Sequence, residues 1–175
     1  MKFSDITQLT PCGNWACDFD LKGFVREIDR MVEEDGLQLI PDFQRGHVWT
    51  TEQQIAYVEF LLRGGITGRV VYLNNPNWNR PRNKTYTDFV CVDGLQRITA
   101  VCKFIKNQLP VFGCLYKDYE DSIRILNTMR INVNDLQSRK EVLQWYLDYN
   151  TGGTVHSDAE INRVKELLAH ETSIS

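Results

Sequence analysis

The chain of 175 residues lacks a long apolar segment. No run approaches the roughly 20 consecutive apolar residues that a membrane-spanning helix requires. The first residues, MKFSDITQLTPCGNWACDFD, contain no continuous apolar stretch after their single lysine, so they do not have the pattern of a secretory signal peptide. The sequence therefore predicts a cytoplasmic protein without a membrane partner.

Paired cysteines are missing as well. The five cysteines are Cys12, Cys17, Cys91, Cys102 and Cys114. They are odd in number and form no Cys-x-x-Cys motif, which argues against a zinc site and against a disulfide framework. We expect reduced thiols that are buried or inactive.

Neither sign of charge is in excess. With 20 Lys and Arg against 23 Asp and Glu, the formal net charge is −3, so any contact with nucleic acid has to come from a local basic patch. The chain also has no internal repeat and no low-complexity linker. Its length therefore predicts one domain over residues 1–175.

Helical and strand-like segments alternate along the chain. Helices are expected after Asp20, Thr50, Gly94, Ser138 and Ser157, and the last two serines each begin a capping box with a glutamate three residues later. Strands are expected over residues 37–40, 69–74, 86–92, 111–116 and 129–133. This order predicts a compact α/β or α+β domain.

The pentapeptide DGLQR, Asp93 to Arg97, stands between a predicted strand and a predicted helix. Glycine at such a joint lets backbone amides approach a ligand, and the start of the helix favours anions. Arg97 adds donors suited to phosphate oxygens, and Asp93 is placed to bind a metal ion or orient a hydroxyl or water. The alternative is structural, with Asp93 capping the helix and Arg97 pairing with it.

A similar group precedes the helix at Thr50, where IPDFQRGHVWT brings Gln44, Arg45 and His47 around Gly46. Taken singly, Arg45 fits a solvated loop and His47 fits a surface position. Two Gln-Arg pairs in one small domain favour a shared anionic ligand.

Two loops offer weaker signals. The segment from Arg69 to Lys84 surrounds Trp78 with Arg80 and Arg82, a composition that suits phosphate contacts and base stacking but also a solvated loop. NTGGT, residues 150–154, suits either an anion-binding nest or a plain turn.

IPDFQRGHVWT, DGLQRITAV and YNTGGTVHSDAEI, in this order, resemble the N-terminal domain of GmrSD-type restriction systems. The resemblance covers about residues 37–168. It implies the ParB/sulfiredoxin-like fold, a small mixed sheet flanked by helices, whose cleft binds a nucleoside triphosphate, ATP or GTP, with Mg²⁺.

The resemblance also implies roles for residues. Asp93, Arg97 and Arg45 would be catalytic, with Asp93 reaching Mg²⁺ through the nucleotide. The nucleotide would contact Gln44, Arg45, His47, Gly94, Gln96, Arg97, Thr99, Asn150, Thr151, Gly152 and Gly153. DNA would contact Arg69, Trp78, Arg80, Arg82 and Lys84.

The expected function is NTP hydrolysis or a kinase-type transfer to a hydroxyl of a nucleoside or modified DNA base. A nuclease is disfavoured because no HNH pattern surrounds His156 or His170. Leu95 stands where the family has the first glutamine of DGQQR, and it favours the alternative of a non-catalytic, nucleotide-gated DNA-binding or inhibitory module. Further partners would be DNA and either a separate effector protein or a second copy of the chain.

Overall fold

A computed structural model describes residues 15–44, 46, 48–79, 85–151 and 158–173. Its strands are β1 (Trp15–Asp20), β2 (Val70–Asn74), β3 (Val90–Asp93) and β4 (Thr128–Asn134). Its helices are α1 (Leu21–Glu33), α2 (Thr51–Leu62), α3 (Leu95–Ile105), the short 3₁₀ helix η2 (Tyr116–Asp118), α4 (Arg139–Thr151) and α5 (Asp158–Ser173).

The described strands form one mixed sheet in the order β1-β4-β2-β3. β4 pairs antiparallel with β1 and parallel with β2, while β2 pairs antiparallel with β3. On one face, Asp18 lies directly opposite Arg130 and forms an ion pair of 2.6 Å with it. Mixed pairing together with interleaved helices makes this an α+β fold, as the sequence predicts.

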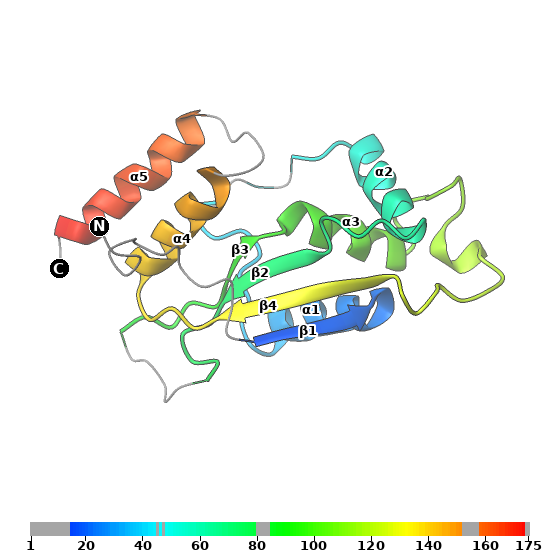
Figure 1. Cartoon of the computed structure of the whole chain (residues 1–175), viewed down its shortest axis with the longest axis horizontal. Helices are drawn as coiled ribbons and strands as arrows, with labels where there is room; N and C mark the ends of the chain where they lie inside the picture. Colours follow the sequence, from blue (N-terminus) through cyan, green and yellow to red (C-terminus); the bar gives the residue numbers. More distant parts are fainter. Residues whose placement is uncertain (1–14, 45, 47, 80–84, 152–157, 174–175) are drawn as a thin grey trace, which may run out of the picture.

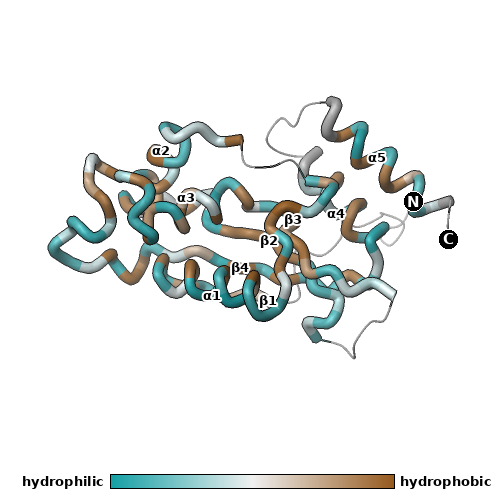
Figure 2. The backbone as a smooth tube through the Cα atoms, turned by 180° about the vertical axis from the view of Figure 1, so that it is seen from behind, coloured by the Kyte–Doolittle hydropathy of each residue, from teal (hydrophilic) through white to brown (hydrophobic). Residues whose placement is uncertain are grey.

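Helices cover the two faces of the sheet unequally. α1 and α3 pack side by side on one face, and α4 and α5 cover the other face near β3 (Figure 1). Successive residues of β2 serve both layers, because Val71 and Leu73 face α1 and α3 whereas Tyr72 faces α4. The apolar stretches run along β2 and β3, while α1 alternates polar and apolar positions (Figure 2).

A third apolar cluster lies outside the sheet. Val58 of α2 packs against Ala100 and Phe104 of α3, and Leu109 and Val111 complete the cluster. This contact fixes α2 on α3, so the loop that leads into α2 is held near the first turn of α3.

The predicted helix starts are confirmed where they are described. Asp20 accepts a hydrogen bond of 2.9 Å from the Gly23 amide, and Thr50 and Gln53 form a reciprocal capping box. Ser138 and Glu141 form a second such box. Ser157 lies outside the described residues.

Two predicted strands are wrong, and one strand was not predicted. Residues 37–40 make only a single bridge from Gln38 to Val90, because Pro41 follows directly. Residues 111–116 turn back at Phe112 and Gly113, whose φ angles are 49° and 78°, so Val111 bridges Cys114 instead of extending. The unpredicted strand is β1.

Candidate functional site

The joint between β3 and α3 is built around Gly94. This residue has φ of 117°, and a Cβ atom added to it would lie 2.6 Å from Cγ1 of Val71 on β2. Glycine is therefore required here by backbone conformation and by the close approach of β2. As the N-cap of α3 it offers no side chain to the first-turn amides, in contrast to the caps of α1 and α2.

Arg97 and Asp93 form an ion pair one turn apart at this joint. Both side chains are mostly covered, with 20% and 29% of their surface exposed. Nη2 of Arg97 makes the hydrogen bond to Asp93. Nε of Arg97 lies buried without a hydrogen-bond partner among the described residues. A buried guanidinium N–H that lacks an acceptor is costly, so this position favours an added anionic oxygen.

Gln96 connects this joint to the loop before α2. Its Oε1 accepts hydrogen bonds from the amides of Val48 and Trp49, at 3.0 and 3.1 Å, and its Nε2 donates to the carbonyl of Gly46 at 3.3 Å. The two Gln-Arg segments of the sequence therefore lie side by side. Gln96 itself is engaged with backbone groups, which gives it a positioning role.

The side chain of Leu95 packs in the core, and that of Thr99 makes a hydrogen bond within α3. Leu95 is buried, with 3% of its surface exposed, so the departure from DGQQR lies on the core side of α3. The hydroxyl of Thr99 donates to the carbonyl of Leu95 at 2.9 Å.

Tyr57 is a neighbour of Arg97 that the sequence analysis did not identify. Its hydroxyl donates to the carbonyl of Gly68 at 2.6 Å, and burial raises the pKa of this phenol while the charge of Arg97 opposes that rise. A tyrosine at a partly buried position of a predicted helix gives no signal of this proximity. The proximity of Tyr57 and Arg97 depends on how α2 packs on α3.

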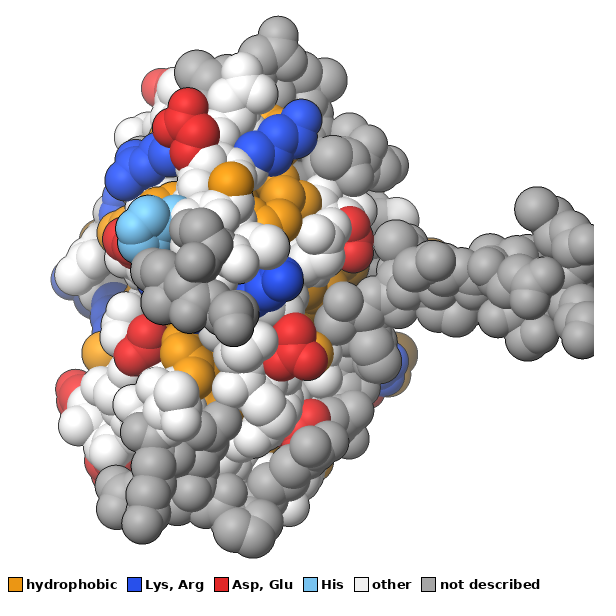
Figure 3. Space-filling view, turned by 90° about the vertical axis from the view of Figure 1, so that its left-hand side faces the viewer, with side chains coloured by type: hydrophobic (Ala, Val, Ile, Leu, Met, Phe, Trp, Pro, Cys, Tyr) orange, Lys and Arg blue, Asp and Glu red, His pale blue; other side chains and the backbone are white. Residues whose placement is uncertain are grey.

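The loop before α2 is also attached to the C-terminal helices. Arg139, at the start of α4, contacts both carboxylate oxygens of Asp42 at 3.0 and 2.7 Å and lies 3.3 Å from Glu171 of α5. The hydrogen bond to Asp42 is the main cause of a raised Arg139 pKa. On the face at the α4–α5 end, acidic and basic side chains are interspersed (Figure 3).

Several predicted site residues cannot be placed. Arg45, His47, Gly152 and Gly153 lie outside the described residues, as do Arg80, Arg82 and Lys84 of the basic loop. Asn150 and Thr151 end α4, and Gln44 precedes the gap at residue 45, with its Oε1 buried and without a partner among the described residues.

Of the five residues predicted to contact DNA, the two that are described make contacts within the fold. Arg69 donates to the carbonyls of Gly65 and Leu126, at 2.5 and 3.0 Å. The Trp78 ring packs against Trp15, with 5.2 Å between centroids. DNA contact by this loop stays a prediction that depends on its other residues.

The described residues contain no group of three His, Cys, Asp or Glu side chains that could hold a metal ion. Asp93 is a single carboxylate and is already paired with Arg97. Such a donor set fits an Mg²⁺ ion that keeps most of its ligands from phosphates and water. Within the described parts of the chain, no helix is long and apolar enough to cross a membrane.

No curated protein and no solved structure matches the chain. The family described as "GmrSD restriction endonuclease, N-terminal domain" matches residues 26–125, which include both Gln-Arg segments but not NTGGT. This match covers more than half of the 175 residues, and the chain therefore belongs to the family of GmrSD restriction endonuclease N-terminal domains.

Proposed function

We propose that the chain binds a nucleoside triphosphate, with ATP and GTP as the first candidates, and hydrolyses or transfers its terminal phosphoryl group. The observation that supports this most is the joint at Gly94, where a helix start without a side-chain cap lies beside the buried Nε of Arg97, which has no hydrogen-bond partner in the described part of the chain. Both features favour phosphate oxygens. Membership in a restriction endonuclease family supports a DNA-related setting for this activity.

Each residue of the proposed site has a distinct role. Arg97 would bind phosphate oxygens through its Nε and stabilise the charge that develops during transfer. Asp93 would hold Mg²⁺ bound to the nucleotide, and this ion would supply charge neutralisation at the phosphates. Gln96 would keep the loop of Gln44, Arg45 and His47 against the phosphates, so that both Gln-Arg segments act on one ligand.

The acceptor of the phosphoryl group distinguishes two forms of this proposal. Water as acceptor gives an NTPase, and a hydroxyl of a nucleoside or modified DNA base gives a kinase. Leu95 is compatible with both, because its side chain is buried in the core and takes no polar group away from Arg97.

A second candidate is a nucleotide-gated DNA-binding or inhibitory module without turnover. The ion pair between Arg97 and Asp93 favours this candidate. A carboxylate engaged by a guanidinium group is less available to hold a metal ion or to accept a proton, so binding without chemistry is the expected state while the pair persists.

The test measures nucleotide binding, phosphate release and product mass with Mg²⁺, with and without DNA. We expect Arg97→Gln to lower nucleotide affinity by about tenfold or more, because it removes a charged donor to phosphate. Arg130→Gln is the matched control, since Arg130 also pairs with an aspartate on the sheet but lies on β4. It should change affinity by less than about twofold.

The outcomes separate the candidates. Phosphate release that Asp93→Asn abolishes supports an enzyme, and a mass increase on DNA identifies the kinase form. Binding that depends on Arg97 without any turnover supports the gated module. If Arg97→Gln and Arg130→Gln bound the nucleotide with equal affinity, both the enzyme and the gated module would be contradicted.

A further inference from the structure

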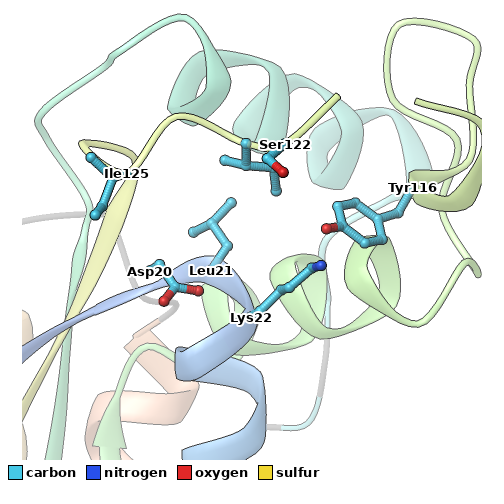
Figure 4. Close-up of a pocket in the computed structure, with 7 residues that line it drawn as sticks. Asp20, Leu21, Lys22, Tyr116, Ser122 and Ile125 are labelled. Atoms are coloured by element: carbon cyan, nitrogen blue, oxygen red, sulfur yellow. The ribbon is translucent and has the colours of Figure 1, made fainter. Parts of the chain in front are cut away.

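Three cavities open around Tyr116, near the end of β1 and the start of β4. The first has a volume of about 260 Å³. Its apolar walls are Leu21, Ile123 and Ile125, and its polar groups include Lys22 and the hydroxyls of Tyr116 and Ser122 (Figure 4). The side chains of Lys22, Tyr116 and Ser122 point toward the same space.

The other two cavities extend the first on either side of Tyr116. One, of about 480 Å³, shares Lys22 and adds Val25 and Ile105. The other, of about 200 Å³, shares Ser122 and Ile123 and adds Phe104. Together they form a groove of apolar subsites within the size range of small-molecule sites. We call it the Tyr116 groove.

Basic side chains outnumber acidic ones along the Tyr116 groove, which is lined by Lys22, Arg26 and Arg124 and by Asp20 and Asp121. The Lys22 ammonium lies 5.2 Å from the centroid of the Tyr116 ring, and Arg26 lines the same side. Within the described part of the chain, neither cation has an ion-pair partner. The nearby carboxylate of Asp20 instead accepts the Gly23 amide at 2.9 Å and so caps α1.

We propose that the Tyr116 groove binds a small organic anion, namely a carboxylate carried on an aromatic or branched apolar body. The carboxylate would meet the Lys22 ammonium and the hydroxyls of Tyr116 and Ser122. The apolar body would fill the cavity between Leu21, Ile123 and Ile125. A neutral molecule of the same shape would leave the ammonium without a counter-charge.

This site is separate from the joint at Gly94. Phe104 and Ile105, at the end of α3, line the Tyr116 groove, whereas Gln96 and Arg97 lie in the first turn. A helix of 11 residues spans about 16 Å, so the two sites occupy opposite ends of α3. The proposal therefore does not depend on nucleotide binding.

The test compares 2-naphthoate with the neutral 2-naphthalenemethanol by isothermal titration calorimetry and by amide chemical-shift mapping. We expect naphthoate to bind at one site about tenfold more tightly or better, with shifts at Lys22, Ser122 and Ile123. Lys22→Met keeps most of the apolar stem and removes the charge. It should weaken naphthoate binding by about tenfold and leave the alcohol unchanged.

Lys140→Met, on the exposed surface of α4, is the matched control and should bind naphthoate like the unmodified protein. Equal affinities for naphthoate and the alcohol would overturn the proposal. So would naphthoate binding that Lys22→Met leaves unchanged, or no binding at millimolar concentrations. Nucleotide affinity of Lys22→Met, measured in parallel, reports separately on the joint at Gly94.

Discussion

At the scale of single residues, the side chain of Gln96 carries three backbone contacts of the loop before α2. Gln96→Ala should lower the free energy of unfolding by about 1–2 kcal/mol, because two amides and a carbonyl lose their partner. The amides of Val48 and Trp49 should also exchange with solvent faster than in the unmodified protein. Chemical denaturation and amide hydrogen exchange measure the two effects.

Gln96→Glu keeps an acceptor for the amides of Val48 and Trp49 but turns a carboxylate oxygen toward the carbonyl of Gly46, so these two amides should stay better protected from exchange than in Gln96→Ala. Gln144→Ala is the control, since the Gln144 side chain is exposed on α4 and its hydrogen bond within the described residues goes to Asp148. Unchanged exchange of Val48 and Trp49 in Gln96→Ala would show that the loop is held by something else.

The sequence predicts an anionic ligand for the two Gln-Arg segments but does not predict how the segments meet. The pairing of Arg97 with Asp93 joins residues four positions apart, and it is one of the two alternatives that the sequence offers. The contact between Gln96 and Val48 joins residues 48 positions apart. No local pattern encodes such a contact, because it depends on how α2 packs on α3.

At the scale of elements, the joint between β3 and α3 requires glycine at position 94 for two reasons, the positive φ of its backbone and the lack of space for a Cβ atom. Gly94→Ala should destabilise the protein by at least about 2 kcal/mol more than Gly36→Ala. Both glycines have positive φ, at 117° and 75°, but only a Cβ at Gly94 would collide with Val71, while the space at Gly36 is open. Chemical denaturation gives the difference.

Val71→Ala provides a second measurement at the same joint, because Cγ1 of Val71 is the atom nearest to the added methyl group. Adding Val71→Ala to Gly94→Ala should therefore cost less than it does in the unmodified protein. Additive costs for the two changes would show that backbone conformation alone determines the effect.

Elements were predictable where the signal is local. Side-chain caps mark the starts of α1, α2 and α4, and all three were expected. β1 was not predicted, although its larger apolar residues Trp15, Cys17 and Phe19 stand at every second position and form the less exposed side of the strand. The strand expected at 111–116 failed because two positive φ angles reverse the chain there, and Phe112 adopts one without being glycine.

At the scale of the whole molecule, the packing of the sheet determines which thiols can react. Among the described cysteines, Cys114 is exposed and Cys91 is buried under α1 and α3. Burial raises the pKa of Cys91, and it raises that of Cys102 to about 12, which leaves little thiolate at neutral pH. Iodoacetamide at pH 8 should therefore modify Cys114 well before Cys91 and Cys102.

Peptide mass mapping over time gives the order of modification, and the same reaction in urea is the control, where the three thiols should react alike. Modification of Cys91 as fast as Cys114 in the native protein would mean that the sheet is not covered as described.

The position of β4 in the sheet has a consequence for biosynthesis. β4 is the strand that joins β1 to β2, yet it is the last of the described strands to be translated. Until residues 128–134 leave the ribosome, β1 has no partner, and the apolar side of α1 has only part of its core to pack on. The family match ends at residue 125, just before this strand. The nascent chain therefore carries both Gln-Arg segments before its sheet can close, and the site acquires its rigid support late in synthesis.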